Sequence, residues 1–184
     1  MLNTILVAID RSSAKTQVFE RALSLAKATN AKLILLHVLS EEEPNSPVMS
    51  LDPSVSNDDR YVHLSPEISP MPNQIYHQQW RSFATEGLNI LRFFADKAIA
   101  DKIETESTQI TGHPSTTICK FAQSCHANVI VIGRRGHSGL QEMLLGSVSN
   151  YVVHHAPCSV LLVQTPLQQT QPTSTTNFTV NIRS

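Results

Sequence analysis

The stretch from residue 128 to 150, NVIVIGRRGHSGLQEMLLGSVSN, decides how the rest of the chain is interpreted. It opens with an apolar run over Asn128–Ile132, which is typical of a strand buried on both faces of a parallel sheet. A glycine-rich segment follows and holds four of the six glycines in the chain: Gly133, Gly136, Gly139 and Gly146. The sequence therefore predicts a buried strand, a glycine-rich loop, and a short helix over Gly146–His155.

Apolar runs of the same kind predict further strands, and helical spacing separates them. The predicted strands are 4–9 (TILVAI), 32–39 (KLILLHVL), a more polar strand at 104–111 that suits a sheet edge, and 159–163 (SVLLV). The predicted helices are Ser13–Thr29 with Ser12 or Ser13 as N-cap, Tyr76–Lys102, and Ser115–Cys125 behind a Pro114 turn. For the second helix we expect Phe83, Leu88, Leu91, Phe94, Ala95 and Ala98 near one face. Strands that alternate with helices predict an α/β fold with one doubly wound parallel sheet.

The chain of 184 residues is long enough for one domain, which we place at residues 1–165. Within it, residues 40–75 hold six of the ten prolines and show no sustained period, which predicts a long loop, an inserted disordered segment or a functional lid. Residues 166–184 are rich in Thr, Gln, Pro and Ser, and we expect a flexible tail there.

Composition argues against several classes of partner. The formal net charge is −1, from 14 basic and 15 acidic side chains, so we expect no nucleic-acid partner. No apolar run approaches the roughly 20 residues of a membrane span, and the chain opens without a signal peptide, so we expect a cytoplasmic protein with no membrane partner. The three cysteines form no CxxC pair, which disfavours a disulfide framework or a zinc site.

The glycine-rich loop has the chemistry of an anion site. Glycine lets main-chain amides approach an anion closely, and a helix N-terminus adds free N–H groups and a partial positive charge. The hydroxyls of Ser147 and Ser149 could add donors, and Asp10 at the end of the first strand should lie nearby, because ligands bind where strand order reverses. The alternative is a plain surface loop with a Gly-Ser cap. Neither a P-loop nor a GxGxxG fingerprint is present.

The spacing Gly133-x2-Gly136-x9-Gly146-Ser147 resembles the ATP-binding motif of the universal stress protein family. The flanking text agrees: ILVAID at 5–10, Gly112-x-Pro114, VIVIGRRGHSG at 129–139 and HAPCSVLLV at 155–163. The resemblance covers about residues 4–163, apart from the proline-rich insertion. It implies a Rossmann-like five-stranded parallel sheet in the order 3-2-1-4-5.

The resemblance also implies a ligand, which is ATP or another adenine nucleotide, with any Mg²⁺ carried on the phosphates. Ala8 and Ile9 would line the base, Asp10 would lie near the ribose, and Val38 would approach the adenine. Arg134 could contact phosphate or face solvent, and the same two alternatives hold for His137. The expected nucleotide-binding residues are Ala8, Ile9, Asp10, Val38, Gly133, Arg134, Gly136, His137, Gly146, Ser147, Val148 and Ser149.

Three functions fit these features: a nucleotide-binding stress-response regulator, a weak ATPase, and an interaction module with an empty site. No catalytic triad or placed general base is visible, so we expect slow ATP hydrolysis at most and assign no catalytic residue. ATP, AMP and a cyclic dinucleotide all remain open as the ligand. The family further implies a homodimer formed through the fifth strand, Ser159–Val163.

Overall fold

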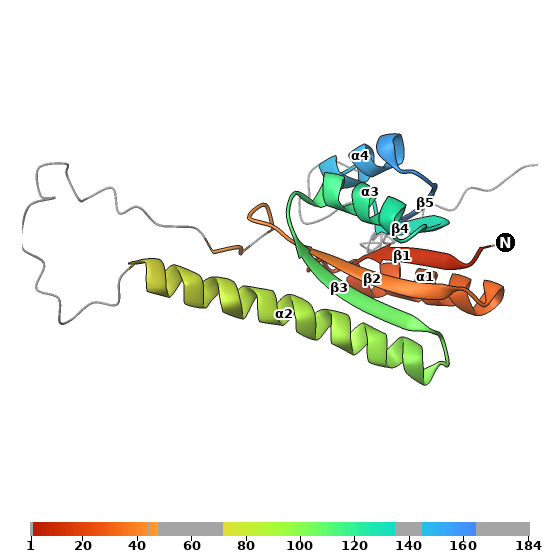
Figure 1. The fold of residues 1–184 in the computed structure, drawn as a ribbon, viewed down its shortest axis with the longest axis horizontal. Helices are drawn as coiled ribbons and strands as arrows, with labels where there is room; N and C mark the ends of the chain where they lie inside the picture. The colour runs from red at the N-terminus through yellow and green to blue at the C-terminus, as the bar shows by residue number, and fades with distance from the viewer. Residues whose placement is uncertain (1, 44, 48–71, 135–144, 165–184) are drawn as a thin grey trace, which may run out of the picture.

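The computed structural model describes residues 2–43, 45–47, 72–134 and 145–164 (Figure 1). Most of the expected proline-rich insertion and all of the expected tail therefore lie outside the described residues. The elements run β1 (Thr4–Ala8), α1 (Lys15–Thr29), β2 (Lys32–Leu39), α2 (Pro72–Ala100), β3 (Thr105–Thr111), α3 (Pro114–Ser124), β4 (Val129–Gly133), α4 (Ser147–His155) and β5 (Ser159–Val163).

The five strands form one parallel sheet in the order β3-β2-β1-β4-β5, which confirms the predicted fold. The three central strands are almost fully buried, as their apolar runs require. β3 lies at one edge and has only exposed and half-buried residues, which explains its polar sequence. β5 forms the other edge.

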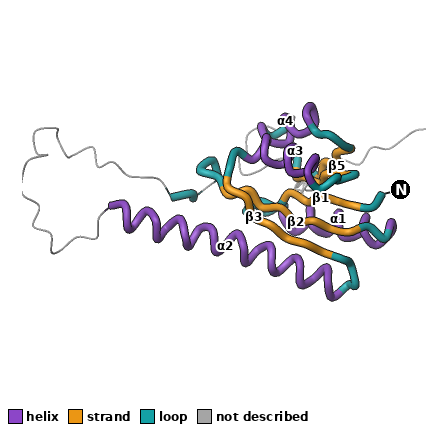
Figure 2. The backbone as a smooth tube through the Cα atoms, viewed as in Figure 1, coloured by secondary structure: helices purple, strands orange, loops and turns teal. Residues whose placement is uncertain are grey.

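Helices cover both faces of the sheet, with α2 on one side and α3 and α4 on the other (Figures 1 and 2). Strand side chains alternate between the faces. Ile5 and Val7 join a core with α1 and α2, in which the rings of Phe19 and Phe94 stack 4.5 Å apart. Leu6 joins a second core with α3 and α4. The topology thus leaves the carboxyl ends of β1, β2 and β4 open between the two helical layers.

Helix α2 begins at Pro72, so the end of the expected insertion is helical, and proline suits a first helical turn. Its N-terminal part extends beyond the strands (Figure 1). The expectation that Leu88 faces the core was wrong, because its side chain is 48% exposed. The buried position is taken by the neighbouring Gly87, which a hydrophobic pattern cannot detect because glycine has no side chain.

The start of α1 also differs from the prediction. The helix begins at Lys15, and its N-cap residue Ala14 makes no side-chain cap. The hydroxyl of Ser12 instead lies 2.6 Å from Asp10 Oδ1, so this serine is used in the turn after β1. The other boundaries agree within one or two residues at most ends, as is usual where elements fray. Pro114 is the first residue of α3, as its position in the sequence predicts.

Candidate functional site

A pocket of about 330 Å³ lies beyond the carboxyl ends of β1, β2 and β4, where the strand order reverses. This is where doubly wound sheets bind ligands, and the volume falls within the usual range for small-molecule sites. The lining residues are Ala8, Ile9, Asp10, Leu36, Val38, Glu42, Glu43, Pro114, Ile118, Ile132, Gly133, Gly146, Ser147, Val148 and Ser149.

Nine of the twelve residues expected at a nucleotide site line this pocket: Ala8, Ile9, Asp10, Val38, Gly133, Gly146, Ser147, Val148 and Ser149. Arg134 is adjacent, and its main-chain N–H donates to Val163 O at 2.8 Å. Gly136 and His137 lie outside the described residues. The fold therefore brings together segments that are more than 100 residues apart in the sequence.

The start of α4 forms one end of the pocket. Asn150 N–H donates to Gly146 O at 2.8 Å and is the first in-helix bond, so the N–H groups of Ser147, Val148 and Ser149 have no acceptor within the helix. The hydroxyl of Ser149 lies 2.7 Å from Arg134 O and 3.0 Å from Gly146 O. Its single hydrogen therefore ties the helix start to the end of β4, and of the two serine hydroxyls expected as donors, that of Ser147 stays available.

Asp10 lines the pocket and follows β1 closely in the sequence. Its Oδ1 accepts hydrogen bonds from Ser12 N–H at 3.1 Å and from the Ser12 hydroxyl at 2.6 Å. This turn holds the carboxylate in place, which is a common use of an Asp after a strand. The turn and a ligand contact do not exclude each other, because a carboxylate has two oxygens and about four acceptor positions.

The main chain of Val38 faces the pocket. Ile9 N–H donates to Leu36 O at 2.8 Å, so the polar groups of Leu36 point toward β1. Val38, two residues further along β2, must point its N–H and C=O the same way. Because β1 has already ended at Ala8, no strand residue faces them there. A donor and an acceptor are thus presented side by side at the pocket wall.

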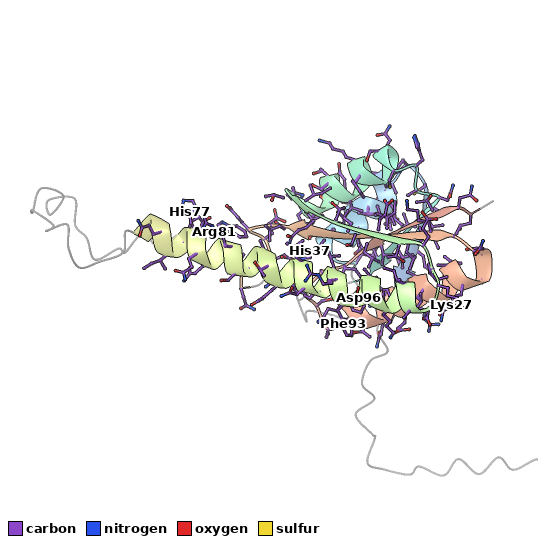
Figure 3. All side chains as sticks on the ribbon, turned by 60° about the horizontal axis from the view of Figure 1, so that its bottom comes forward. Lys27, His37, His77, Arg81, Phe93 and Asp96 are labelled. Atoms are coloured by element: carbon purple, nitrogen blue, oxygen red, sulfur yellow. The ribbon has the colours of Figure 1, made fainter. Side chains whose placement is uncertain are left out.

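Two carboxylates that sequence reasoning missed, Glu42 and Glu43, line the pocket on the β2 side. Glu43 Oε1 lies 3.0 Å from Nε2 of the fully buried His37. On the other side of the imidazole, Nδ1 lies 3.0 Å from Gln109 Nε2, which also donates to Ala84 O. Figure 3 shows His37 beside helix α2. The one signal for this network was a histidine within an apolar strand.

Helix α2 can approach His37 only because residue 87 is glycine. A Cβ at this position would lie 2.7 Å from two atoms of the His37 ring and closer still to Gln109 Nε2. The imidazole is therefore held on three sides, by Glu43, Gln109 and the α2 backbone. This packing fixes the orientation of the Glu43 carboxylate at the pocket wall.

Arg11 lies behind Glu43 and connects the pocket wall to α2. Its guanidinium stacks 3.7 Å from the centre of the Phe83 ring and donates to Phe83 O. NH1 forms an ion pair with Glu86 at 2.9 Å, whereas Nε is 4.0 Å from Glu43 Oε2. Neither that nitrogen nor Glu43 Oε2 has a hydrogen-bond partner in the part of the chain that the structure describes.

Glu42 is held by a second histidine. Its Oε1 lies 3.0 Å from His113 Nε2, and His113 Nδ1 lies 2.8 Å from the Ser115 hydroxyl. The pair connects the segment after β2 to the start of α3, and both side chains are more than half exposed. Each carboxylate at this end of the pocket is thus oriented by its own imidazole.

The described residues also bear on metal binding, membrane insertion and thiol chemistry. Within them, no group of three His, Cys, Asp or Glu side chains could hold a metal ion, and no helix is both long and apolar enough to span a membrane. Cys119, Cys125 and Cys158 are free thiols, and burial raises the pKa of each. Raised thiol pKa values disfavour the nucleophilic thiolate.

The fold and the pocket define a Rossmann-like α/β protein with a pocket at the topological switch point. The sequence pattern of the universal stress protein family matches residues 1–164. The chain therefore belongs to the universal stress protein family. It is 33% identical to the universal stress protein Sll1388 of Synechocystis over 160 residues, covering 87% of this chain and 96% of the relative. With YxiE of Bacillus subtilis it shares 32% identity over 164 residues, covering 89% and 100%.

Solved structures of the family share the fold. The universal stress protein UspA from Lactobacillus plantarum superposes with a TM-score of 0.66 at 23% identity, covering 88% of this chain and 97% of that one. A universal stress protein in complex with cAMP gives 0.55 at 24% identity, covering 88% and 96%. A family protein from Arabidopsis thaliana with AMP bound gives 0.57 at 22% identity, covering 93% and 97%.

Proposed function

We propose that this protein binds an adenine nucleotide, with ATP as the expected ligand, and acts in the cytoplasm as a stress-response regulator. The observation that carries the proposal is the pairing, in one pocket, of the α4 N-terminus with the main-chain donor and acceptor of Val38. Adenine presents an acceptor at N1 next to a donor at the 6-amino group, which complements that pair. The solved relatives that hold cAMP and AMP support the same ligand class.

The phosphates would lie at the α4 end. The main-chain N–H groups of Ser147, Val148 and Ser149 are suitable donors, and the helix dipole favours an anion there. We assign Gly133, Arg134, Gly136 and His137 to the same end on the strength of the family motif. Mg²⁺, where present, would be carried by the phosphates.

We propose a binding role in preference to catalysis. No lysine or arginine is among the described lining residues, whereas phosphoryl transfer relies on a cationic clamp or metal at the transferred group. Binding of the nucleotide would then change the shape of the protein or the partners that it binds. Any hydrolysis would be slow, and a turnover assay on the purified protein measures it directly.

The test is titration calorimetry of the purified protein with ATP, AMP and cAMP, each up to millimolar concentration. Gly146→Val should weaken the tightest of these ligands at least about 100-fold, which is about 2.7 kcal/mol, because a side chain there enters the phosphate end. The fold should persist, since Gly146 has φ −62° and ψ 153°, which valine adopts readily. Val153→Ala, on the exposed side of α4, is the matched control.

Two results would contradict the proposal. One is the absence of binding by the wild-type protein to all three nucleotides at millimolar concentration. The other is wild-type affinity in a folded Gly146→Val variant, as judged by circular dichroism and the thermal midpoint.

We also propose that the protein is a homodimer formed through β5. This edge strand is apolar, and Leu161 on it is 39% exposed, although unprotected apolar edges are aggregation hazards. Leu161→Lys should convert the dimer to a monomer in light scattering. Ser107→Lys, on the opposite edge strand, should leave the mass unchanged. A dimer that survives Leu161→Lys would exclude this interface.

A further inference from the structure

We propose that Arg11 transmits the filling of the pocket to the N-terminal part of α2, so that the packing of Phe83 against Trp80 depends on whether a nucleotide is bound. The inference rests on the proposed nucleotide function and deepens it, because it names the route by which occupancy would reach another surface. None of these three residues belongs to the described lining of the pocket. Their contribution would therefore be to regulation and not to contact with the ligand.

Arg11 is tied to α2 through its guanidinium. The group stacks 3.7 Å from the centre of the Phe83 ring and donates to Phe83 O, and one terminal nitrogen pairs with Glu86 at 2.9 Å. The ring of Phe83 in turn meets the ring of Trp80 edge-on, with centroids 5.4 Å apart. A shift of Arg11 therefore acts on Phe83 and, through Phe83, on Trp80.

The side of Arg11 that faces the pocket wall makes an incomplete contact. Its Nε lies 4.0 Å from Glu43 Oε2, and neither atom has a hydrogen-bond partner among the residues that the structure describes. Both side chains are largely buried, with 13% and 9% exposed. Buried polar atoms without partners are costly, and a shift of about 1 Å would bring these two within hydrogen-bond distance. The pair thus has two arrangements within reach, an open one as in the structure and a closed one.

The partner that can move is Arg11, because Glu43 is held in place. Glu43 Oε1 lies 3.0 Å from His37 Nε2, and the imidazole packs against α2 at Gly87, where an added Cβ would not fit. This packing wedges α2 at Gly87, whereas its N-terminal part extends beyond the strands (Figure 1). Closing the contact would therefore draw the guanidinium, and Phe83 with it, toward Glu43 while the rest of α2 stays in place.

A ligand in the pocket favours the closed arrangement for an electrostatic reason. Glu43 lines the pocket, so solvent there screens the attraction between its carboxylate and the guanidinium. A nucleotide that takes the place of this solvent lowers the local dielectric constant, and opposite charges then attract more strongly. Asp10, which also lines the pocket, directly precedes Arg11, so ligand contacts at this turn act on the same segment. Filling the pocket thus shifts the balance between the two arrangements.

The opposing explanation is a static brace, in which Arg11 only anchors the turn after β1 to α2. A brace contributes to stability with and without nucleotide alike. A transmitter, in contrast, makes the environment of Trp80 depend on the ligand. By reciprocity, it also makes nucleotide affinity depend on residues of α2 that do not line the pocket.

The first experiment uses Trp80, which is the only tryptophan of the chain, as a fluorescent reporter. Excitation at the red edge of tryptophan absorption avoids absorption by adenine. Titration with the nucleotide that binds most tightly should change the emission with the midpoint that calorimetry gives. Arg11→Lys keeps the charge but loses the planar fork, so it should bind nucleotide and lose at least about half of the emission change. Arg92→Lys, exposed on the same helix, should keep all of it.

The second experiment measures affinity by calorimetry in variants of α2. Phe83→Leu removes the ring beneath the guanidinium, and we expect it to change the nucleotide Kd at least about fivefold. Phe93→Leu is the matched control. Phe93 is 65% exposed on the same helix (Figure 3), so its variant should leave Kd unchanged.

Unchanged Trp80 emission in wild-type protein that calorimetry shows to be saturated would overturn the inference. So would a full emission change in a folded Arg11→Lys variant, or wild-type affinity in a folded Phe83→Leu variant. Each variant supplies a readout where the other fails to fold. If the wild-type protein binds no nucleotide by calorimetry, the proposed function itself fails and this inference falls with it. If it binds nucleotide without any change at Trp80, the nucleotide function stands and only the transmission falls.

Discussion

The two ends of the pocket are built from different chemical groups. At the α4 end, the polar surface comes from main-chain N–H groups beside glycines and one exposed hydroxyl, that of Ser147. At the β2 end it comes from two carboxylates, each oriented by a histidine, and from the main-chain N–H and C=O of Val38. The first end therefore offers mainly donors and the second mainly acceptors.

The two ends are also held in place in different ways. The donor end depends on helix geometry, which positions its N–H groups wherever α4 begins. The acceptor end depends on a buried side-chain network that reaches through β2 and β3 to the backbone of α2. Such networks stabilise a single arrangement when fully satisfied and are costly when partly broken. We therefore expect the larger effects of mutation on stability at the acceptor end.

The largest expected effect on stability follows from Gly87→Ala. The added Cβ would collide with His37 and Gln109, so we expect the free energy of unfolding to fall by about 2 kcal/mol. Alanine also has a higher helix propensity than glycine, which alone would stabilise the variant by about 1 kcal/mol and so opposes the cost of the collision. Urea unfolding measures the net change in the free energy of unfolding. Asn89→Ala, exposed on the same helix, should change stability by no more than about 0.5 kcal/mol.

An unchanged or higher stability in Gly87→Ala would contradict the description of a rigid acceptor end. It would mean that His37 and Gln109 move aside at little cost, and the Glu43 carboxylate would not be fixed at the pocket wall.

The two ends also differ in how much of each could be predicted from the sequence. The apolar runs predicted four of the five strands, because buried parallel strands leave a local signature. The fifth, β3, was predicted as a more polar strand suited to a sheet edge. The spacing of Gly133 and Gly146 pointed to the α4 end because a main-chain site is set by consecutive residues. The expectation for Ser149 was partly wrong, since its hydroxyl is used within the protein.

The acceptor end had no comparable signature. Its contacts join residues 6 to 72 positions apart: Glu43 meets His37, and His37 meets Gln109. Such pairs depend on the tertiary packing of β2, β3 and α2, and no local period encodes them. The same reason explains Leu88, whose expected burial failed because Gly87 takes the inner position.

Smaller effects are expected at the donor end, where one serine should affect stability and another should affect nucleotide binding. Ser149→Ala removes the hydroxyl contact to Arg134 O and should lower the free energy of unfolding by about 1 kcal/mol. Ser147→Ala should leave stability within about 0.5 kcal/mol, because its side chain is exposed, while it weakens nucleotide binding. Urea unfolding and calorimetry on both variants give the two quantities. Equal stability of both variants would show that the Ser149 tie contributes nothing.

The smallest expected effect concerns the layer of α3 and α4 behind the donor end, and how often this layer opens in the absence of ligand. Cys119, Cys125 and Cys158 pack against the core that contains Val152 of α4, and burial raises the pKa of all three thiols. Because the thiolate is the nucleophile, alkylation by iodoacetamide at pH 8 should be slower in the folded protein than in urea. The folded pKa values lie above the unfolded ones, so the associated stability is present below about pH 9 and is lost as the pH rises further. Mass spectrometry of the alkylated protein resolves each thiol, and folded-state rates equal to those in urea would mean that the α3 and α4 layer opens freely. In that case the N–H groups of the donor end would have to be ordered by the nucleotide, and the contrast with the rigid acceptor end would become one of dynamics as well as chemistry.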